Sequence, residues 1–280
     1  MATATLRGCD LYYEAQGEGE VIILLPGLGH DHTYYAKTAP LLATVGKTVA
    51  PDPRGLGLSK SAATRYSVEE WAQDVAGLIE HLGAERAHLV GSSLGACVAL
   101  QVALDFPARV ASLCLVAGFA ELDRSLELNF RMRIEVIEQL GLGDVLASHI
   151  AMWTLGRTFI NTDEGKAAVD RLFASVRRNS PGRYIAFIRS ILDFGRLEPH
   201  QAGQPKITAR LGEVRVPTCV IVGGEDILTP VSHAKLMADA IEGAELHVIP
   251  GCGHITFTER PEETAALIHA FLRKVTAGRA

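Results

Sequence analysis

The chain has 280 residues, of which 48% are hydrophobic, and its formal net charge is −5 at pH 7. That length suits a single α/β domain with an insertion better than two equal domains. The mild charge and scattered basic residues argue against a nucleic-acid partner or a polybasic membrane contact, and no apolar run reaches the length of a membrane span.

The cysteines and the N-terminus indicate a reducing compartment. Five cysteines occur at irregular spacings without a C-x-x-C pair, so they give no sign of a zinc site. The N-terminal segment lacks the apolar core of a secretory signal. We therefore expect a cytoplasmic protein. The sequence leaves the oligomeric state open, with a homodimer as one option.

In chain order, apolar runs bounded by turn residues predict the strands. The run at 21–25 has no polar break, as expected of a strand buried on both faces of a parallel sheet. The first two strands should be joined by a tight turn at Gly8-Cys9. The predicted strands occupy residues 3–7, 10–15, 21–25, 47–50, 86–90, 110–116, 216–222 and 246–249.

Helical patterns lie between these runs. Residues 33–45 form the first predicted helix. Ser67 and Glu70 form a capping box that opens a second helix, which ends near Gly83. A third stops before Pro107, and a last one covers 261–274. Strands that alternate with helices predict a mostly parallel sheet flanked by helices on both faces.

Residues 120–210 show helical signals but no convincing strand. Predicted helices there cover 121–140, 144–155, 164–178 and 184–194, followed by a polar stretch from Gly195 to Lys206. An insertion between two late strands is a natural lid over the carboxyl edge of the sheet, where open α/β sheets bind ligands. We therefore predict a core at 1–119 and 211–280 and a helical lid at 120–210.

Glycines and serines crowd one joint between a strand and a helix. The segment from Gly91 to Gly95 reads G-S-S-L-G. In a G-x-S-x-G pattern the central serine can be a nucleophile on a strained turn that lifts its side chain clear of the sheet. This register makes Ser93, rather than Ser92, the candidate nucleophile. A glycine-rich turn without catalysis is the alternative for the motif alone.

A serine nucleophile needs a base, and the base needs an orienting acid. Asp226 follows the strand at 216–222, and His254 follows the strand at 246–249. Loops at the carboxyl ends of parallel strands share one edge of the sheet, so Ser93, Asp226 and His254 should converge. The order Ser, Asp, His is that of the α/β-hydrolases.

Five blocks in this order resemble the α/β-hydrolase family, in its lid-bearing branch of esterases, lactonases and C–C hydrolases. They are LLPGLGH at 24–30, DPRGLGLS at 52–59, GSSLG at 91–95, GGEDILTP at 223–230 and GCGHITFTERPEE at 251–263. Within the family, the sequence is most similar to 3-oxoadipate enol-lactonase-like proteins. The resemblance implies an oxyanion hole made by the backbone N–H groups of Leu28 and Leu94. Many relatives have His-Gly where this chain has Pro26-Gly27.

These residues predict a serine hydrolase that cleaves a small carboxylic ester or lactone through an acyl-enzyme, without cofactor or metal. The apolar lid favours a small-molecule substrate with an apolar or ring-shaped acyl group. Two alternatives stay open. One is a C–C bond hydrolase with the same triad, and the other is a slow-turnover ligand receptor of the same fold.

Several residues have competing interpretations. Glu225, Glu121 and Asp123 are rival candidates for the acid. His30 and His32 lie beside the proposed oxyanion loop and are interpreted as loop residues, while Asp52 and Arg54 are interpreted as holding their own loop. Six apolar lid residues are assigned mainly to the core, with at least one expected to face the pocket: Met152, Trp153, Leu155, Phe159, Phe187 and Phe194.

Overall fold

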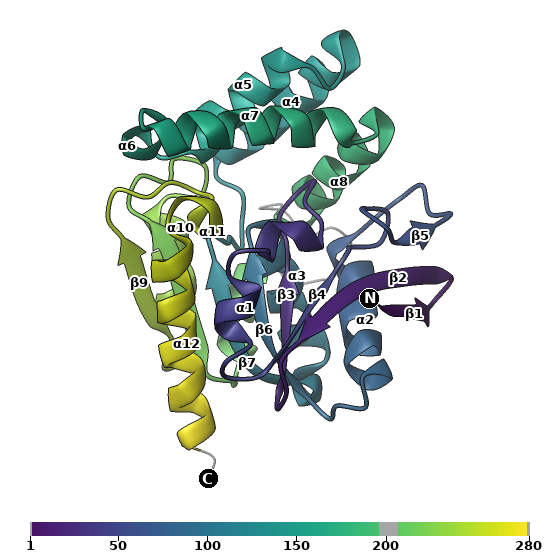
Figure 1. The fold of residues 1–280 in the computed structure, drawn as a ribbon, viewed down its shortest axis with the longest axis vertical. Helices are drawn as coiled ribbons and strands as arrows, with labels where there is room; N and C mark the ends of the chain where they lie inside the picture. Colours follow the sequence, from purple (N-terminus) through teal and green to yellow (C-terminus); the bar gives the residue numbers. More distant parts are fainter. Residues whose placement is uncertain (1, 196–206, 279–280) are drawn as a thin grey trace.

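The computed structural model describes residues 2–195 and 207–278. Within them, nine strands form one sheet in the order β1-β2-β4-β3-β6-β7-β8-β9, with β5 paired to β2 (Figure 1). The strands from β4 to β9 along this path pair in parallel, whereas β1, β2 and β5 pair antiparallel. The strands are β1 Ala2–Leu6, β2 Cys9–Gln16, β3 Val21–Leu25, β4 Lys47–Pro51, β5 Lys60–Ser61, β6 Ala87–Ser92, β7 Val110–Val116, β8 Thr218–Gly223 and β9 Glu245–Ile249.

Buried apolar side chains explain the central strands. All residues of β3, β6, β7 and β8 are buried, because helices cover both faces of the sheet. The predicted first turn is off by one residue. Arg7 and Gly8 both have positive φ, so they form the turn, and Cys9 already belongs to β2.

Two apolar cores lie on opposite faces of the sheet. Helices α1 (Ala39–Leu42) and α12 (Pro261–Ala277) contribute to one of them. Helices α2 (Val68–His81), α3 (Leu94–Asp105) and α10 (Val231–Ala240) pack in the other. The fold class is therefore confirmed: a mostly parallel sheet flanked by helices.

The prediction of one continuous helix at 33–45 is wrong. The chain forms a single 3-10 turn at His32–Tyr35 and then the short helix α1, in which Pro40 occupies the first turn. A proline inside a longer helix would lack an N–H donor and clash with the carbonyl four residues earlier. Near Pro40, this favours a new helix start over continuation of the previous turn.

The chain between β7 and β8 contains most of the remaining helices. In Figure 1 the helices α4 to α8 of this insertion lie beyond the carboxyl ends of the strands, with α7 crossing above them, whereas Arg210 of α9 contacts Leu104 and Asp105 at the far end of α3. Its helices are α4 Arg124–Leu140, α5 Asp144–Thr154, α6 Arg157–Ile160, α7 Asp163–Arg178, α8 Pro181–Phe194 and α9 Ile207–Arg210. The four long helices match the predicted ranges closely, whereas α6 and α9 were not predicted. Of the polar stretch at 195–206, residues 196–206 lie outside the described residues.

A final short helix, α11 (Thr256–Glu259), follows the loop that contains His254. No helix among the described residues has both the length and the apolar character needed to cross a membrane. The division into a core at 1–119 and 211–280 and a lid at 120–210 stays a prediction.

Candidate active site

Ser93 lies on a sharp turn between β6 and α3. Its φ of 53° and ψ of −116° are in the left-handed half of conformational space, which a residue with a side chain rarely adopts. A Cβ atom on Gly91 would come within 2.2 Å of the Gly95 carbonyl oxygen, and one on Gly95 within 2.0 Å of the Leu25 carbonyl oxygen. The two glycines are therefore needed because backbone passes directly against them on both sides of the serine.

The turn also leaves backbone donors beside Ser93. Leu94 is the first residue of α3, and the first N–H groups of a helix have no acceptor within it. The loop after β3 approaches from the other side, since a Cβ atom on Gly27 would lie 3.3 Å from the Ser93 Cβ. Leu28 follows in that loop and lines the same cavity as Ser93. Leu94 is thus next to Ser93 in the chain and Leu28 lines the same cavity, and their role as oxyanion donors stays a prediction.

His254 and Asp226 contact each other directly. The His254 Nδ1 lies 2.8 Å from the Asp226 Oδ2, and both side chains are almost fully buried. The Asp226 Oδ1 accepts hydrogen bonds from the backbone N–H groups of Leu228 and Thr229, and the Thr229 hydroxyl lies 2.9 Å from Oδ2. These contacts fix the carboxylate and leave Oδ2 facing the imidazole, which favours the tautomer that carries its proton on Nδ1.

Ser93 and His254 line one inner cavity between the sheet edge and the helical insertion. Its volume is about 50 Å³, and it adjoins an outer cavity of about 740 Å³. Both are lined by Gly29, His30, Tyr34, Leu172, Ser175, Asn179 and Ile255. The structure therefore brings together Ser93, Asp226, His254 and Leu28, although they are far apart in the sequence.

The insertion contributes other residues to the inner cavity than those expected. Of the six apolar residues named above, Leu155, Phe159, Phe187 and Phe194 are buried, Met152 is exposed, and Leu155 alone lines the outer cavity. The insertion's part of the inner wall consists of Phe130, Arg133, Ile150, Thr154, Leu172, Ser175, Val176, Asn179 and Tyr184. Arg133 was missed, although it lies in phase with the buried stripe of α4 formed by Leu126, Asn129, Phe130 and Ile137.

The rival candidates have other partners. The Ser92 hydroxyl lies 3.1 Å from the Tyr34 hydroxyl. Asp123 caps α4 and contacts His233, and Glu225 accepts a hydrogen bond from the backbone N–H of Thr158. Within the described residues, the side-chain contacts of His254 are to Asp226 and Thr229, and they do not include Glu121. Asp226 is the acid that the geometry favours.

The loop that contains His254 is joined to the insertion. The His254 N–H donates to the Thr154 carbonyl, at the end of α5. The buried Glu259 carboxylate accepts from the N–H groups of Gly156, in the insertion, and Gly253, before the histidine. Burial raises the pKa of Glu259 to about 6, against these hydrogen bonds, which lower it.

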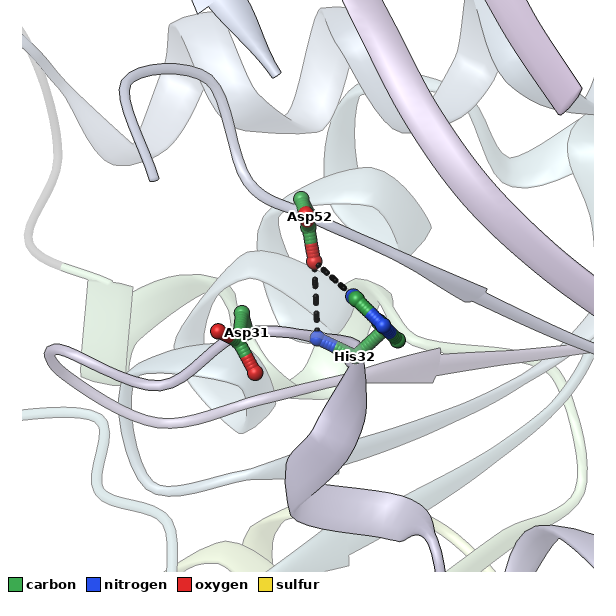
Figure 2. A group of neighbouring side chains, drawn as sticks. All are labelled: Asp31, His32 and Asp52. Atoms are coloured by element: carbon green, nitrogen blue, oxygen red, sulfur yellow. Dashed lines mark hydrogen bonds and ion pairs between the residues drawn. The ribbon is translucent and has the colours of Figure 1, made fainter. Parts of the chain in front are cut away.

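Asp31, His32 and Asp52 form a second titratable group, shown in Figure 2. Their potential ligand atoms lie within 4.8 Å of one another. The Asp52 Oδ1 already accepts from the His32 N–H and contacts its Nδ1, while Oδ2 accepts from the Leu58 N–H. A cation would have to replace these contacts. These three residues are better explained as a hydrogen-bonded link between two loops. This explanation agrees with the interpretation of Asp52 as a structural residue.

His30 is beside the nucleophile but separate from this group. It lines both cavities, and its ring lies 4.7 Å from that of Tyr34. Burial lowers the pKa of His30 to about 4, so its imidazole is neutral at pH 7. It offers the cavity a polar but uncharged wall.

Comparisons with known proteins agree with this geometry. A family model described as alpha/beta hydrolase fold matches residues 20–261. A Variovorax paradoxus protein named carbamate hydrolase RutD is 32% identical over 95% of this chain and 97% of its own length. A 2-hydroxy-6-oxo-6-phenylhexa-2,4-dienoate hydrolase of Burkholderia cepacia is 30% identical over 89% of this chain and 86% of its own.

Solved structures share the same fold. A thermophilic esterase from Thermogutta terrifontis has a TM-score of 0.82 and 26% identity, covering 98% of this chain and 97% of its own. The enol-lactonase from Burkholderia xenovorans LB400 has a TM-score of 0.84 at 21% identity, covering 97% of this chain and 100% of its own, and so supports the fold alone.

Proposed function

Since the chain belongs to the α/β-hydrolase fold family, we propose that it is a serine hydrolase that cleaves a small carboxylic ester or lactone. The observation that carries this proposal is the hydrogen bond between His254 and Asp226 at the cavity that Ser93 lines. A strained serine, a buried imidazole and a buried carboxylate have complementary roles in acyl transfer.

In the proposed mechanism, His254 removes the Ser93 proton as the Ser93 Oγ attacks the substrate carbonyl. Asp226 holds the imidazole and stabilises its charged form. The N–H groups of Leu28 and Leu94 donate to the oxyanion, and loss of one such donor typically costs about 3 kcal/mol of transition-state stabilisation. His254 then protonates the leaving alcohol and activates the water that hydrolyses the acyl-enzyme. The insertion acts as the lid.

C–C bond cleavage is the second candidate. It is favoured by the 30% identity with the dienoate hydrolase of Burkholderia cepacia, which extends over most of both chains. Both reactions include addition of a nucleophile to a carbonyl carbon. In C–C cleavage the departing carbon leaves as an enolate stabilised by the conjugated carbonyl and takes a proton from His254, so the same three residues can serve either. An ester and a vinylogous diketone should therefore be compared as substrates of the same preparation.

The first experiment measures hydrolysis of p-nitrophenyl acetate by the wild type, Ser93→Ala and Ser92→Ala at equal folded concentration. Ser93→Ala should lower kcat by at least about 10³-fold, because the attacking oxygen is lost. Ser92→Ala should keep most of the turnover. Wild-type turnover in Ser93→Ala would refute the assignment, and a single burst without turnover in the wild type would favour the ligand-receptor alternative.

A further inference from the structure

Arg133 is a buried cation at the inner cavity. It projects from the middle of α4, is only 3% exposed, and lines the cavity together with Ser93 and His254. Within the described residues, its Nε and Nη2 atoms have no hydrogen-bond partner. Burying a charged group without an opposite charge or full hydrogen bonding is strongly unfavourable, so this arginine needs an explanation beyond packing.

The neighbours of Arg133 do not neutralise it. Its guanidinium lies 5.3 Å from the centre of the Phe130 ring, and it contacts the Tyr184 hydroxyl. His149 and Asn129 lie nearby on α5 and α4, and burial, together with the charge of Arg133, lowers the pKa of His149 to about 4. No carboxylate of the described residues is paired with the guanidinium. The residues around it are thus neutral, and its charge is unmatched.

The outer cavity has the same electrostatic character. Arg171, Arg178 and Arg183 line it, and among the described residues Asp31 is the one acidic residue in its wall. The residues that the two cavities share are uncharged, so a ligand that passes from the arginines of the outer cavity to Arg133 meets no opposing charge on the way. A cavity with an excess of one sign of charge concentrates ligands of the opposite sign.

We propose that Arg133 binds a carboxylate on the acyl part of the substrate, so that the chain acts on esters or lactones of short dicarboxylic or oxo acids. This inference rests on the proposed function and specifies its substrate class. The acyl part is assigned to the inner cavity because the leaving alcohol must depart through the outer one. A planar guanidinium with two unpaired nitrogens can hold a carboxylate through two parallel hydrogen bonds. The volume of about 50 Å³ favours a short acyl chain.

The test compares monomethyl succinate with methyl succinamate, whose carboxamide has the same shape without the charge. Wild type should have a kcat/KM at least about tenfold higher for the acid ester. Arg133→Met should lower kcat/KM for monomethyl succinate by about 10- to 100-fold, mainly through KM, since hydrogen bonds to charged groups are the strong ones. Turnover of methyl succinamate should change little.

Two further variants make the comparison specific. Arg133→Lys should keep part of the preference, because it keeps the charge but not the paired donors. Arg177→Gln removes an exposed arginine of α7 that pairs with Asp144 and lines neither cavity, and it should leave the substrate ratio unchanged. Arg133→Met should also melt no lower than the wild type, since it removes an unmatched buried charge.

The inference would be overturned if Arg133→Met lost turnover of both esters equally, or if the wild type did not prefer monomethyl succinate. The proposed ester hydrolysis would still hold in either case. If no ester is cleaved, the proposed function fails instead, and binding still decides the role of Arg133. Calorimetry should then show that Ser93→Ala binds succinate but not succinamide. The double variant Ser93→Ala/Arg133→Met should no longer bind succinate. Equal binding of succinate with and without Arg133 would refute the inference.

Discussion

Backbone crowding fixes the position of Ser93 at the scale of single residues. Gly91 and Gly95 have backbone oxygens where a Cβ atom would be, and the chain can turn there only because both lack a side chain. Ser93 alone carries the strained φ of the turn. Strain at one residue is retained when its surroundings determine the conformation completely, as the buried strands and the helix α3 do here.

Asp226→Asn tests the acid assignment at the same scale. The amide oxygen can still accept from the N–H groups of Leu228 and Thr229, so the loop should fold as before. The amide nitrogen would face the His254 Nδ1 and favour the wrong tautomer. We expect kcat for p-nitrophenyl acetate to fall by about 10⁴-fold with little change in melting temperature.

Matched variants of the rival acids complete this test. Glu225→Gln and Asp123→Asn each remove one carboxylate whose partners are Thr158 and His233 rather than His254. Both variants should keep turnover within a few-fold of the wild type. If Asp123→Asn lost activity and Asp226→Asn did not, the acid would have to be reassigned.

At the scale of elements, Glu259 joins the helical insertion to the loop that contains His254. Its carboxylate connects the end of α5 to the loop before His254, and its pKa is raised from 4.5 to about 6, chiefly by burial. The folded state therefore binds this proton more tightly than the unfolded state. Protonation of Glu259 therefore stabilises the folded state. This contribution to the free energy of unfolding is fully present below pH 4.5 and is lost as the pH rises through about 6.

Glu259→Gln removes this titration. The free energy of unfolding of the wild type, minus that of the variant, should fall by about 2 kcal/mol between pH 4 and pH 7. Urea denaturation at several pH values measures this difference. Glu18→Gln, in the exposed loop between β2 and β3, is the matched control for loss of a carboxylate. A flat difference curve for Glu259→Gln would show that this carboxyl is not the buried group described above.

Elements with strong local signals could be predicted from the sequence. The capping box at Ser67 begins α2, since the Glu70 N–H donates to the Ser67 hydroxyl. The long helices α4, α5, α7 and α8 carry their own periodicity. The short helices α6, α9 and α11 could not be predicted, because single turns depend on contacts such as that between Thr158 and Glu225 rather than on a repeating pattern.

For the whole molecule, some residues of the candidate site could be placed from the sequence, whereas others depend on tertiary packing. Ser93, Asp226 and His254 follow strands and could be placed at one sheet edge by topology alone. The partners of Arg133 and Glu259 depend on how the insertion sits above that edge, which local sequence does not specify. The apolar pattern of the insertion suggested an apolar pocket, whereas the wall contains an unmatched arginine.

A buried ion pair joins the N-terminal hairpin to the rest of the molecule. The Arg54 guanidinium donates to both oxygens of Asp74, on α2, and to the carbonyls of Leu6 and Arg7 at the end of β1. Both side chains are almost fully buried. The contacts agree with the interpretation of Arg54 as a residue that holds its loop. They also connect three segments far apart in the sequence.

Arg54→Met should therefore destabilise the protein by about 3–5 kcal/mol, because it leaves the Asp74 carboxylate buried without a partner. Asp74→Leu should cost a similar amount for the converse reason. The double variant Arg54→Met/Asp74→Leu should recover much of the loss, since an apolar pair of similar volume often replaces a buried ion pair without penalty. Urea denaturation of the four proteins closes this cycle. If the double variant were as unstable as the sum of the singles, the two side chains would be acting independently, and the ion pair would not be what joins the hairpin to the sheet.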